Sequence, residues 1–301
     1  MSRTALLIRT HYADDQLRGF VEQLRADGAF DVFILADERR GPVALGDAAK
    51  IVLTPELPAE LGLYGGTPNL LWRCGDYALY AARRALPDYE AFWMIEPDVR
   101  LCSTRPSDIL SRFPPPDQVD FLAAHLRPAE PDWNWARTMS ADDGPVWRCL
   151  FALVRVSARA LDVMLEERRR SSRLFEESGQ DPAFWPNDEA FTASALARNG
   201  LVCRDFNDFG QVYEPVGFSF WLPISEREFL AAGREGWIYH PVLSGQRYFL
   251  KLFRLASEQG NLDGLERLID SLVGSEWSEE EAAGHRRALA FARSQLTTQA
   301  G

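Results

Sequence analysis

The sequence has little of what marks several large protein classes. It has only four cysteines, Cys74, Cys102, Cys149 and Cys203, with no CxxC pair and no Cys/His cluster at zinc-binding spacing. This pattern argues against a zinc finger or a redox motif. The apolar run near the N-terminus, residues 5–8, is too short for a secretory signal or a membrane span. We therefore expect a cytoplasmic protein with reduced thiols and no transmembrane segment.

Common catalytic and nucleotide-binding motifs are also absent. The chain has no GxSxG elbow, no P-loop and no GxGxxG fingerprint, and His11, His125 and His285 fit no nucleophile arrangement. Basic residues are outnumbered, because 33 Lys and Arg stand against 44 Asp and Glu, for a net charge of -11. Such a chain repels polyanions, so we expect no nucleic-acid partner. A phosphate ligand would need a metal ion or another local device.

What is present is the composition of a globular protein with alternating strands and helices. The 301 residues are 46% hydrophobic and 26% charged, which suffices for a large core. Apolar runs predict strands at 4–8, 31–36, 50–53 and 91–95, and periodic patterns predict helices at 17–24 and 76–86. The passage 54–69, rich in Pro and Gly, is expected to be a loop. This order is typical of parallel strands joined by crossover helices.

The second half is less regular. We expect strands at 121–124 and 150–156, a helix at 158–170 that ends on the Arg168–Arg170 run, and a helix at 187–198. From residue 246 onward the pattern is helical, and Ser278 with Glu281 predicts a capping box. The apolar stripe of this tail, which includes Leu262, Leu265 and Ile269, is expected to pack on the sheet.

Candidate ligand-binding residues follow the predicted strands. Ligands of open parallel sheets bind beyond the carboxyl ends of the strands. Arg9 and Thr10 follow the first strand, Asp37 the second, and Glu96 and Asp98 the fourth. Two carboxylates separated by one residue can hold a divalent cation, which would let an acidic protein receive a diphosphate. Taken alone, an acidic pair of this kind is more often a solvated turn than a metal site.

Residues 4–241 resemble a GT-A type glycosyltransferase. The resemblance rests on a strand that ends in an acidic triplet (FWMIEPDVRL), a later acidic helix start (FWPNDEAF) and a terminal histidine (YHPV). It implies an α/β fold with a Rossmann-like mixed sheet flanked by helices. It also implies a catalytic domain at 1–243, followed by a C-terminal helical appendage at 244–301.

The implied activity is metal-dependent transfer of a sugar from a nucleotide diphosphate donor to an acceptor hydroxyl. The acceptor could be a polysaccharide, a lipid-linked sugar, a protein or a small molecule, and peripheral membrane contact is compatible with this. By the same resemblance, Glu96, Asp98 and His240 would bind Mn²⁺ or Mg²⁺, although Glu96 stands where the family usually has Asp. Asp188 or Glu189 would be the catalytic base of an inverting reaction, with Asp188 preferred.

Further positions are implied for the substrates. Five residues are expected to bind the nucleotide: Arg9, Thr10, Asp37, Arg73 and Asp76. Tryptophans 133, 135, 185 and 221 could stack on a sugar ring, and Trp185 is the best placed by sequence.

Two other functions stay open. A nucleotidyltransferase is disfavoured because RTHYADD, after the first strand, lacks glycine and has one arginine. The other is an inactive sugar- or nucleotide-binding module. Loss of activity would explain why Glu96 stands in place of the usual Asp, and why Asn187 stands where the family usually has an acid.

Overall fold

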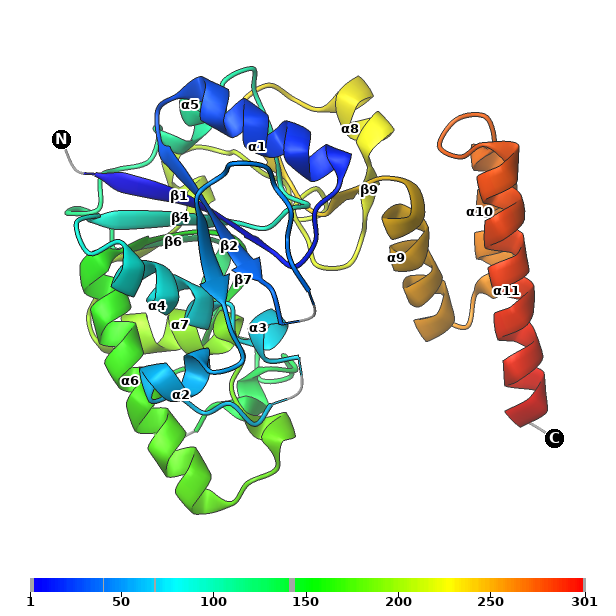
Figure 1. Ribbon diagram of the computed structural model, residues 1–301. Coiled ribbons are helices and arrows are strands. Elements are labelled where there is room, and N and C mark those ends of the chain that lie inside the picture. The colour runs from blue at the N-terminus through cyan, green and yellow to red at the C-terminus, as the bar shows by residue number, and fades with distance from the viewer. Residues whose placement is uncertain (1–2, 40, 68, 141–143, 300–301) are drawn as a thin grey trace.

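The computed structural model describes residues 3–39, 41–67, 69–140 and 144–299, with side chains up to residue 293. A seven-stranded sheet lies at its centre in the order β3-β2-β1-β4-β7-β6-β8 (Figure 1). Its strands are β1 (Thr4–Thr10), β2 (Asp31–Asp37), β3 (Lys50–Leu53), β4 (Ala91–Ile95), β6 (Phe121–Pro128), β7 (Trp147–Ser157) and β8 (Cys203–Asp205). Strands β1 to β4 are mutually parallel, and β7 is antiparallel to both of its neighbours. The predicted α/β architecture with a mixed sheet is confirmed.

Helices cover both faces of the sheet. Helices α4 (Asp76–Ala85), α6 (Ala158–Ser178) and α7 (Asp188–Arg198) pack on one face, and α1 (Asp15–Asp27) and α5 (Ser107–Leu110) on the other. Side chains of β1 alternate between the two cores, because Leu7 joins the first and Leu6 the second. Strand β4 is buried on both faces, which explains its unbroken apolar run.

Two helix predictions need correction. The predicted loop at 54–69 contains the short helix α2 (Leu57–Leu61), which has Pro58 in its first turn and ends at Gly62 with φ 71°. Helix α6 continues past the arginine run to Ser178, because the left-handed residue that ends it is Gly179 at φ 62°. Arg168 is therefore an interior helix residue and does not cap a C-terminus.

Smaller elements fill the connections. They are α3 (Leu70–Arg73), β5 (Arg100–Cys102), η1 (Ala136–Thr138), η3 (Pro182–Phe184), η4 (Phe206–Phe209), β9 (Ile224–Ser225), α8 (Glu226–Ala232), β10 (Trp237–Tyr239) and β11 (Val242–Leu243). The pairing of β10 with β5 matters most, because β5 follows the acidic end of β4 and β10 leads into His240. This pairing brings His240 beside the acidic triplet.

The C-terminal helices have a core of their own. Helices α9 (Gly245–Glu258), α10 (Leu262–Leu272) and α11 (Glu279–Gln299) pack on one another around Phe249 and Trp277, and Figure 1 shows them beside the sheet. The expectation that their apolar stripe covers the sheet is wrong, because Leu265 and Ile269 are buried inside this third cluster.

Local features of this region agree with the sequence. The Ser278 hydroxyl accepts a hydrogen bond from the Glu281 backbone N–H at 3.2 Å, and the Glu281 carboxylate accepts one from the Ser278 N–H, so the capping box is confirmed. The predicted boundary at 243/244 falls between β11 and α9, and the division into two domains remains a prediction. No helix in the described ranges combines the length and apolarity that a bilayer span requires.

Candidate active site

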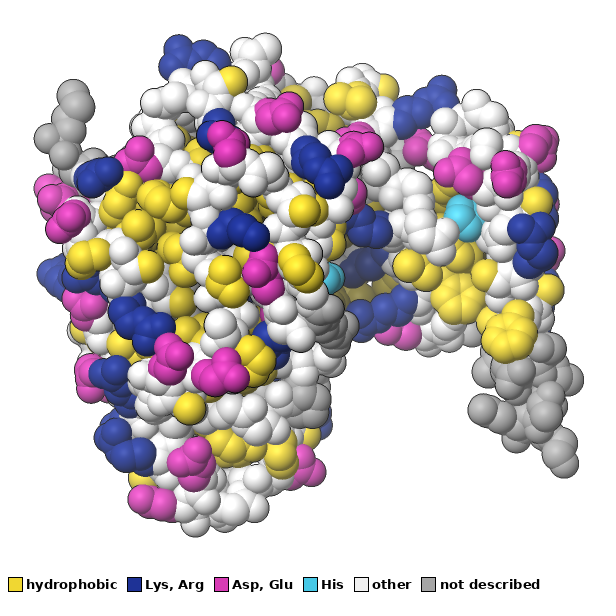
Figure 2. Space-filling model, in the orientation of Figure 1, with side chains coloured by type: hydrophobic (Ala, Val, Ile, Leu, Met, Phe, Trp, Pro, Cys, Tyr) yellow, Lys and Arg dark blue, Asp and Glu magenta, His cyan; other side chains and the backbone are white. Residues whose placement is uncertain are grey.

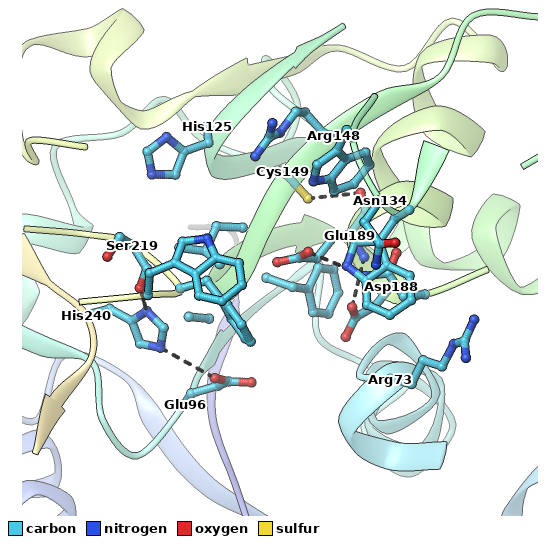
Figure 3. Close-up of a pocket in the computed structure, with 18 of the residues that line it drawn as sticks. Arg73, Glu96, His125, Asn134, Arg148, Cys149, Asp188, Glu189, Ser219 and His240 are labelled. Atoms are coloured by element: carbon cyan, nitrogen blue, oxygen red, sulfur yellow. Dashed lines mark hydrogen bonds and ion pairs between the residues drawn. The ribbon is translucent and has the colours of Figure 1, made fainter. Parts of the chain in front are cut away.

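A cavity of about 1030 Å³ lies beyond the carboxyl ends of β1 and β4 (Figure 3). Six residues that the sequence predicts for the site line it: Arg9, Arg73, Glu96, Asp188, Glu189 and His240. They come from five separate segments of the chain or their ends, so only the fold brings them together. In Figure 3, Glu96 and His240 lie on one side of the cavity and Asp188 and Glu189 on the other.

Glu96, Asp98 and His240 form a cluster on the first of these sides. Their ligand atoms all lie within 4.8 Å of one another. The Nε2 atom of His240 is 3.5 Å from Oδ1 of Asp98 and 3.8 Å from Oε2 of Glu96. The backbone fixes this approach, since the Val242 N–H donates to the Asp98 carbonyl at 2.8 Å.

The donor set fits a divalent cation. Carboxylate oxygens with an imidazole nitrogen suit Mn²⁺ or Mg²⁺. In octahedral coordination with metal–ligand bonds of about 2.1 Å, neighbouring and opposite ligand atoms lie roughly 3.0 to 4.2 Å apart. The distances of 3.5 and 3.8 Å from Nε2 of His240 to Asp98 and Glu96 fall within this range. The Nδ1 atom of His240 lies 2.9 Å from the Ser219 carbonyl, so a proton there leaves Nε2 free to face the carboxylates.

The carboxylates and the imidazole of this cluster stabilise one another's charged forms. Burial alone would lower the pKa of His240, but Asp98 and Glu96 together raise it above its usual value. Burial opposes ionisation of Asp98, yet the nearby imidazole lowers the pKa of that carboxyl. The Asp98 carboxylate and the His240 imidazole therefore each favour the charged form of the other.

Arg9, at the end of β1, connects the two acidic groups. Its guanidinium forms an ion pair with Glu96 and lies 3.8 Å from Oδ2 of Asp188. It also donates to the Leu71 carbonyl at 3.1 Å. Burial works against its charge, but Glu96 and Asp188 raise the pKa of Arg9 further. Arg9 therefore stays cationic and fixes the distance between the acid pair and the Glu96 cluster.

Gly75 allows this arrangement. Its backbone N–H donates to Oδ2 of Asp188 at 2.8 Å. A Cβ atom on Gly75 would lie 1.7 Å from Nη1 of Arg9 and 2.7 Å from Oδ2 of Asp188. Only glycine permits both side chains to come this close.

Asp188 and Glu189 open helix α7. Asn187 is the N-cap, and its side chain accepts from the Ala190 N–H at 3.0 Å, which explains an amide where the resemblance leads one to expect an acid. Burial raises the pKa of Asp188 to about 7 and that of Glu189 to about 8. Both acids therefore change charge near neutral pH, as general acids and bases do.

The two acids differ in their contacts. Both carboxylate oxygens of Asp188 accept backbone hydrogen bonds, from Gly75 and from Glu189, at 2.8 Å each. The Glu189 carboxylate has the Asn187 amide at 3.4 Å and a backbone hydrogen bond from Phe151, and it is the more exposed of the two. Glu189 is thus the acid with more freedom to meet a ligand.

The structure does not bring the other predicted metal and nucleotide residues to the cavity wall. Asp98 is not among the residues of the wall, although its carboxylate lies 3.5 Å from Nε2 of His240. Asp37 pairs with Arg39 at 2.8 Å, and the Thr10 hydroxyl donates to the Tyr12 carbonyl at 2.8 Å. Asp76 is fully buried in a bidentate pair with Arg168, so it holds α4 to α6 and has no surface for a nucleotide.

Comparison with known proteins gives a fold neighbour and no family. No protein-family model matches the sequence, and no curated protein matches it. One similar solved structure is a glycosyltransferase involved in the glycosylation of the major capsid of PBCV-1. It shares 11% identity, the match covers 85% of this chain and 99% of that chain, and the TM-score is 0.39. Function is therefore argued from the site itself.

Several cavity residues have no sequence signal that could single them out. Besides Arg9 and Arg73, the guanidinium groups of Arg127, Arg148 and Arg254 line the wall, although the chain is acidic overall. Figure 2 shows Lys and Arg side chains gathered in the hollow beside the C-terminal helices. Arg254 belongs to α9, so the C-terminal helices contribute to the wall.

The tryptophan preference from the sequence needs correction. Trp185 is fully buried, where its ring packs against Tyr64 and Phe175. It is a core residue and cannot stack on a substrate.

Proposed function

We propose that this protein transfers a sugar from a nucleotide diphosphate donor to an acceptor hydroxyl, in a metal-dependent reaction that inverts the anomeric carbon. One observation carries the proposal. Glu96 and His240 face the acid pair across one large cavity, Asp98 lies next to His240, and Arg9 contacts both Glu96 and Asp188. The first group suits a diphosphate with its cation, and the second suits removal of a proton.

Glu96, Asp98 and His240 would hold Mn²⁺ or Mg²⁺, which would neutralise charge on the departing diphosphate. The chain's own contribution there is to keep two carboxylates and one imidazole nitrogen converged. Asp98 is fixed by its histidine contact, and His240 by Ser219. Arg9 holds one oxygen of Glu96 and leaves the other facing His240.

Glu189 is the base in this proposal, in place of the Asp188 that the sequence favours. A base needs a free lone pair within hydrogen-bond reach of the acceptor hydroxyl, and a pKa near the working pH. Asp188 is occupied by Gly75, the Glu189 N–H and Arg9. Burial, and after it the negative charge of Asp188, raises the pKa of Glu189, which makes Glu189 a stronger base. Asp188 is then a positioning residue.

The proposal also assigns the two parts of the chain. Residues 1–243 form the catalytic domain, and residues 244–301 form a helical appendage that supplies Arg254 to the cavity. Because all four cysteines are free thiols, we place the protein in the cytoplasm.

The test is release of nucleoside diphosphate from a panel of UDP-, GDP- and dTDP-sugars, with Mn²⁺, with Mg²⁺ and with a chelator. We expect metal-dependent release by the parent, loss of release in Asp98→Asn, and no change in Asp88→Asn, an exposed aspartate outside the cavity. Failure of the parent with every donor would favour an inactive binding module. A product of retained configuration, read by NMR, would contradict the assigned base.

A further inference from the structure

The cavity is unusually rich in tryptophan. Four of the nine tryptophans of the chain line it: Trp72, Trp133, Trp135 and Trp221. Two of them, Trp133 and Trp135, flank Asn134 on the segment between β6 and β7. Both rings are half-buried, and Asn134 is exposed. An apolar ring, an amide and a second ring therefore stand side by side on the cavity wall.

Each of these two rings has the guanidinium of an arginine over one face. The guanidinium of Arg148 lies 4.9 Å from the centre of the Trp133 ring, and that of Arg73 lies 5.1 Å from the Trp135 ring. An arginine over one face leaves the opposite face of the indole for another partner. The arginines are themselves anchored, Arg148 by Glu130 at 2.8 Å and Arg73 by the Ala183 carbonyl at 2.6 Å.

The segment that carries the rings is held by its own turns. The Trp133 N–H donates to the Glu130 carbonyl at 3.0 Å, and the Ala136 N–H donates to the Trp133 carbonyl at 2.9 Å. The Thr138 hydroxyl donates to the Trp135 carbonyl at 2.7 Å. The two rings are thus set in place before any ligand arrives, which lowers the entropic cost of binding.

Figure 3 shows where this segment lies in the cavity. Asn134 is beside Asp188 and Glu189, on the side opposite Glu96 and His240. A ligand resting on Trp133 and Trp135 would therefore present its polar groups to the acid pair. It would leave the Glu96 side open for the diphosphate.

We propose that Trp133 and Trp135 form the acceptor subsite and that the acceptor is a carbohydrate. A pyranose has an apolar face of C–H groups that suits an indole ring, and equatorial hydroxyls that suit amide and carboxylate groups at its edge. Asn134 and Glu189 supply those groups. The acceptor role rests on the proposed function, whereas carbohydrate binding at these rings stands by itself.

The test is saturation-transfer NMR, with irradiation of the aromatic protons of the protein. The probes are the methyl glycosides of glucose, galactose, mannose and N-acetylglucosamine, without donor or metal. At least one probe should receive saturation on the C–H protons of one ring face. Trp133→Ala and Trp135→Ala should each bind it roughly 3- to 10-fold more weakly. Trp133→Phe should restore part of the affinity.

Trp237→Ala is the matched control, because Trp237 is also half-buried and has the Arg234 guanidinium 4.8 Å from its ring centre, yet it does not line the cavity. It should bind the probe as the parent does.

Equal binding by all the variants, equal weakening in Trp237→Ala, or no saturation of any probe would overturn the proposal. If the sugar binds but no donor is cleaved, the proposed function fails and the carbohydrate site stands. If the donor is cleaved but no probe binds, the acceptor class is wrong.

Discussion

Replacement of Gly75 by alanine tests the contact network that links the two halves of the site. Gly75 has φ -61° and ψ -22°, values that alanine adopts freely, so the backbone itself gives no reason for a loss of stability. The added methyl group would instead overlap Nη1 of Arg9 and crowd Oδ2 of Asp188. Both side chains are almost buried, and their ion pairs and the Gly75 hydrogen bond would have to change if they moved away.

The size of the effect follows from three contributions. Loss of the charge-assisted hydrogen bond from the Gly75 N–H to Asp188 costs about 1.5 to 3 kcal/mol. Crowding of a packed site costs about 1 to 3 kcal/mol. Because alanine lowers the conformational entropy of the unfolded chain, it raises the free energy of unfolding by about 0.4 to 1 kcal/mol. We expect Gly75→Ala to lower the free energy of unfolding by roughly 2 to 5 kcal/mol.

Gly19→Ala is the matched control for a urea-unfolding comparison. Gly19 is an exposed helical residue with nothing within 4 Å of the position of a Cβ atom. That variant should be more stable than the parent by about 0.4 to 1 kcal/mol. If Gly75→Ala unfolds at the same urea concentration as Gly19→Ala, the close approach of Arg9 and Asp188 to Gly75 is refuted.

Three further predictions concern buried charge. Arg168→Met leaves the buried Asp76 carboxylate without its cation, so it should destabilise the protein by about 3 to 5 kcal/mol in urea unfolding. Adding Asp76→Leu should recover much of this loss. If the double variant recovers none of it, the pairing of Arg168 with Asp76 is contradicted. Because burial raises the pKa of Asp188 to about 7 and of Glu189 to about 8, the folded chain keeps protons that the unfolded chain loses near pH 4. The free energy of unfolding should therefore fall as the pH rises from about 4 to about 8, and Asp188→Asn with Glu189→Gln should flatten this fall. Burial lowers the pKa of His285, whose ring stacks on Phe249 at 3.9 Å, so the contribution of His285 to stability should drop as the pH falls below about 6.5 and should offset part of the effect of the two acids. His285→Phe should remove that drop, and a variant that keeps it would place the titrating group elsewhere.

The elements at the centre of the fold were predictable from the sequence. Strand β4 is a bulky apolar run that ends in two acids, and α7 begins at Asn187 with two acids in its first turn. Such local patterns predict an element and its ends because they reflect burial and capping within one segment. The position of the acidic cluster at a strand end followed from the same pattern.

The partners of each side chain were not predictable. The apolar stripe of α10 indicates that one face is buried, but periodicity does not say against which surface, and here it packs on α9 and α11. Trp185 and Trp135 look alike in sequence, yet one is core and the other lines the cavity. The contacts among Arg9, Gly75 and Asp188 join segments far apart in the chain, and no local pattern encodes them.

Calorimetric titration of UDP and GDP into the protein, with Mn²⁺ and with a chelator, tests the metal site most directly. We expect the parent to bind one of these nucleotides tightly only when Mn²⁺ is present. Asp98→Asn should lose this metal-dependent binding, and Asp88→Asn should retain it. Equal affinity of the parent and Asp98→Asn for nucleotide and Mn²⁺ would contradict the assignment of Glu96, Asp98 and His240 as the metal site.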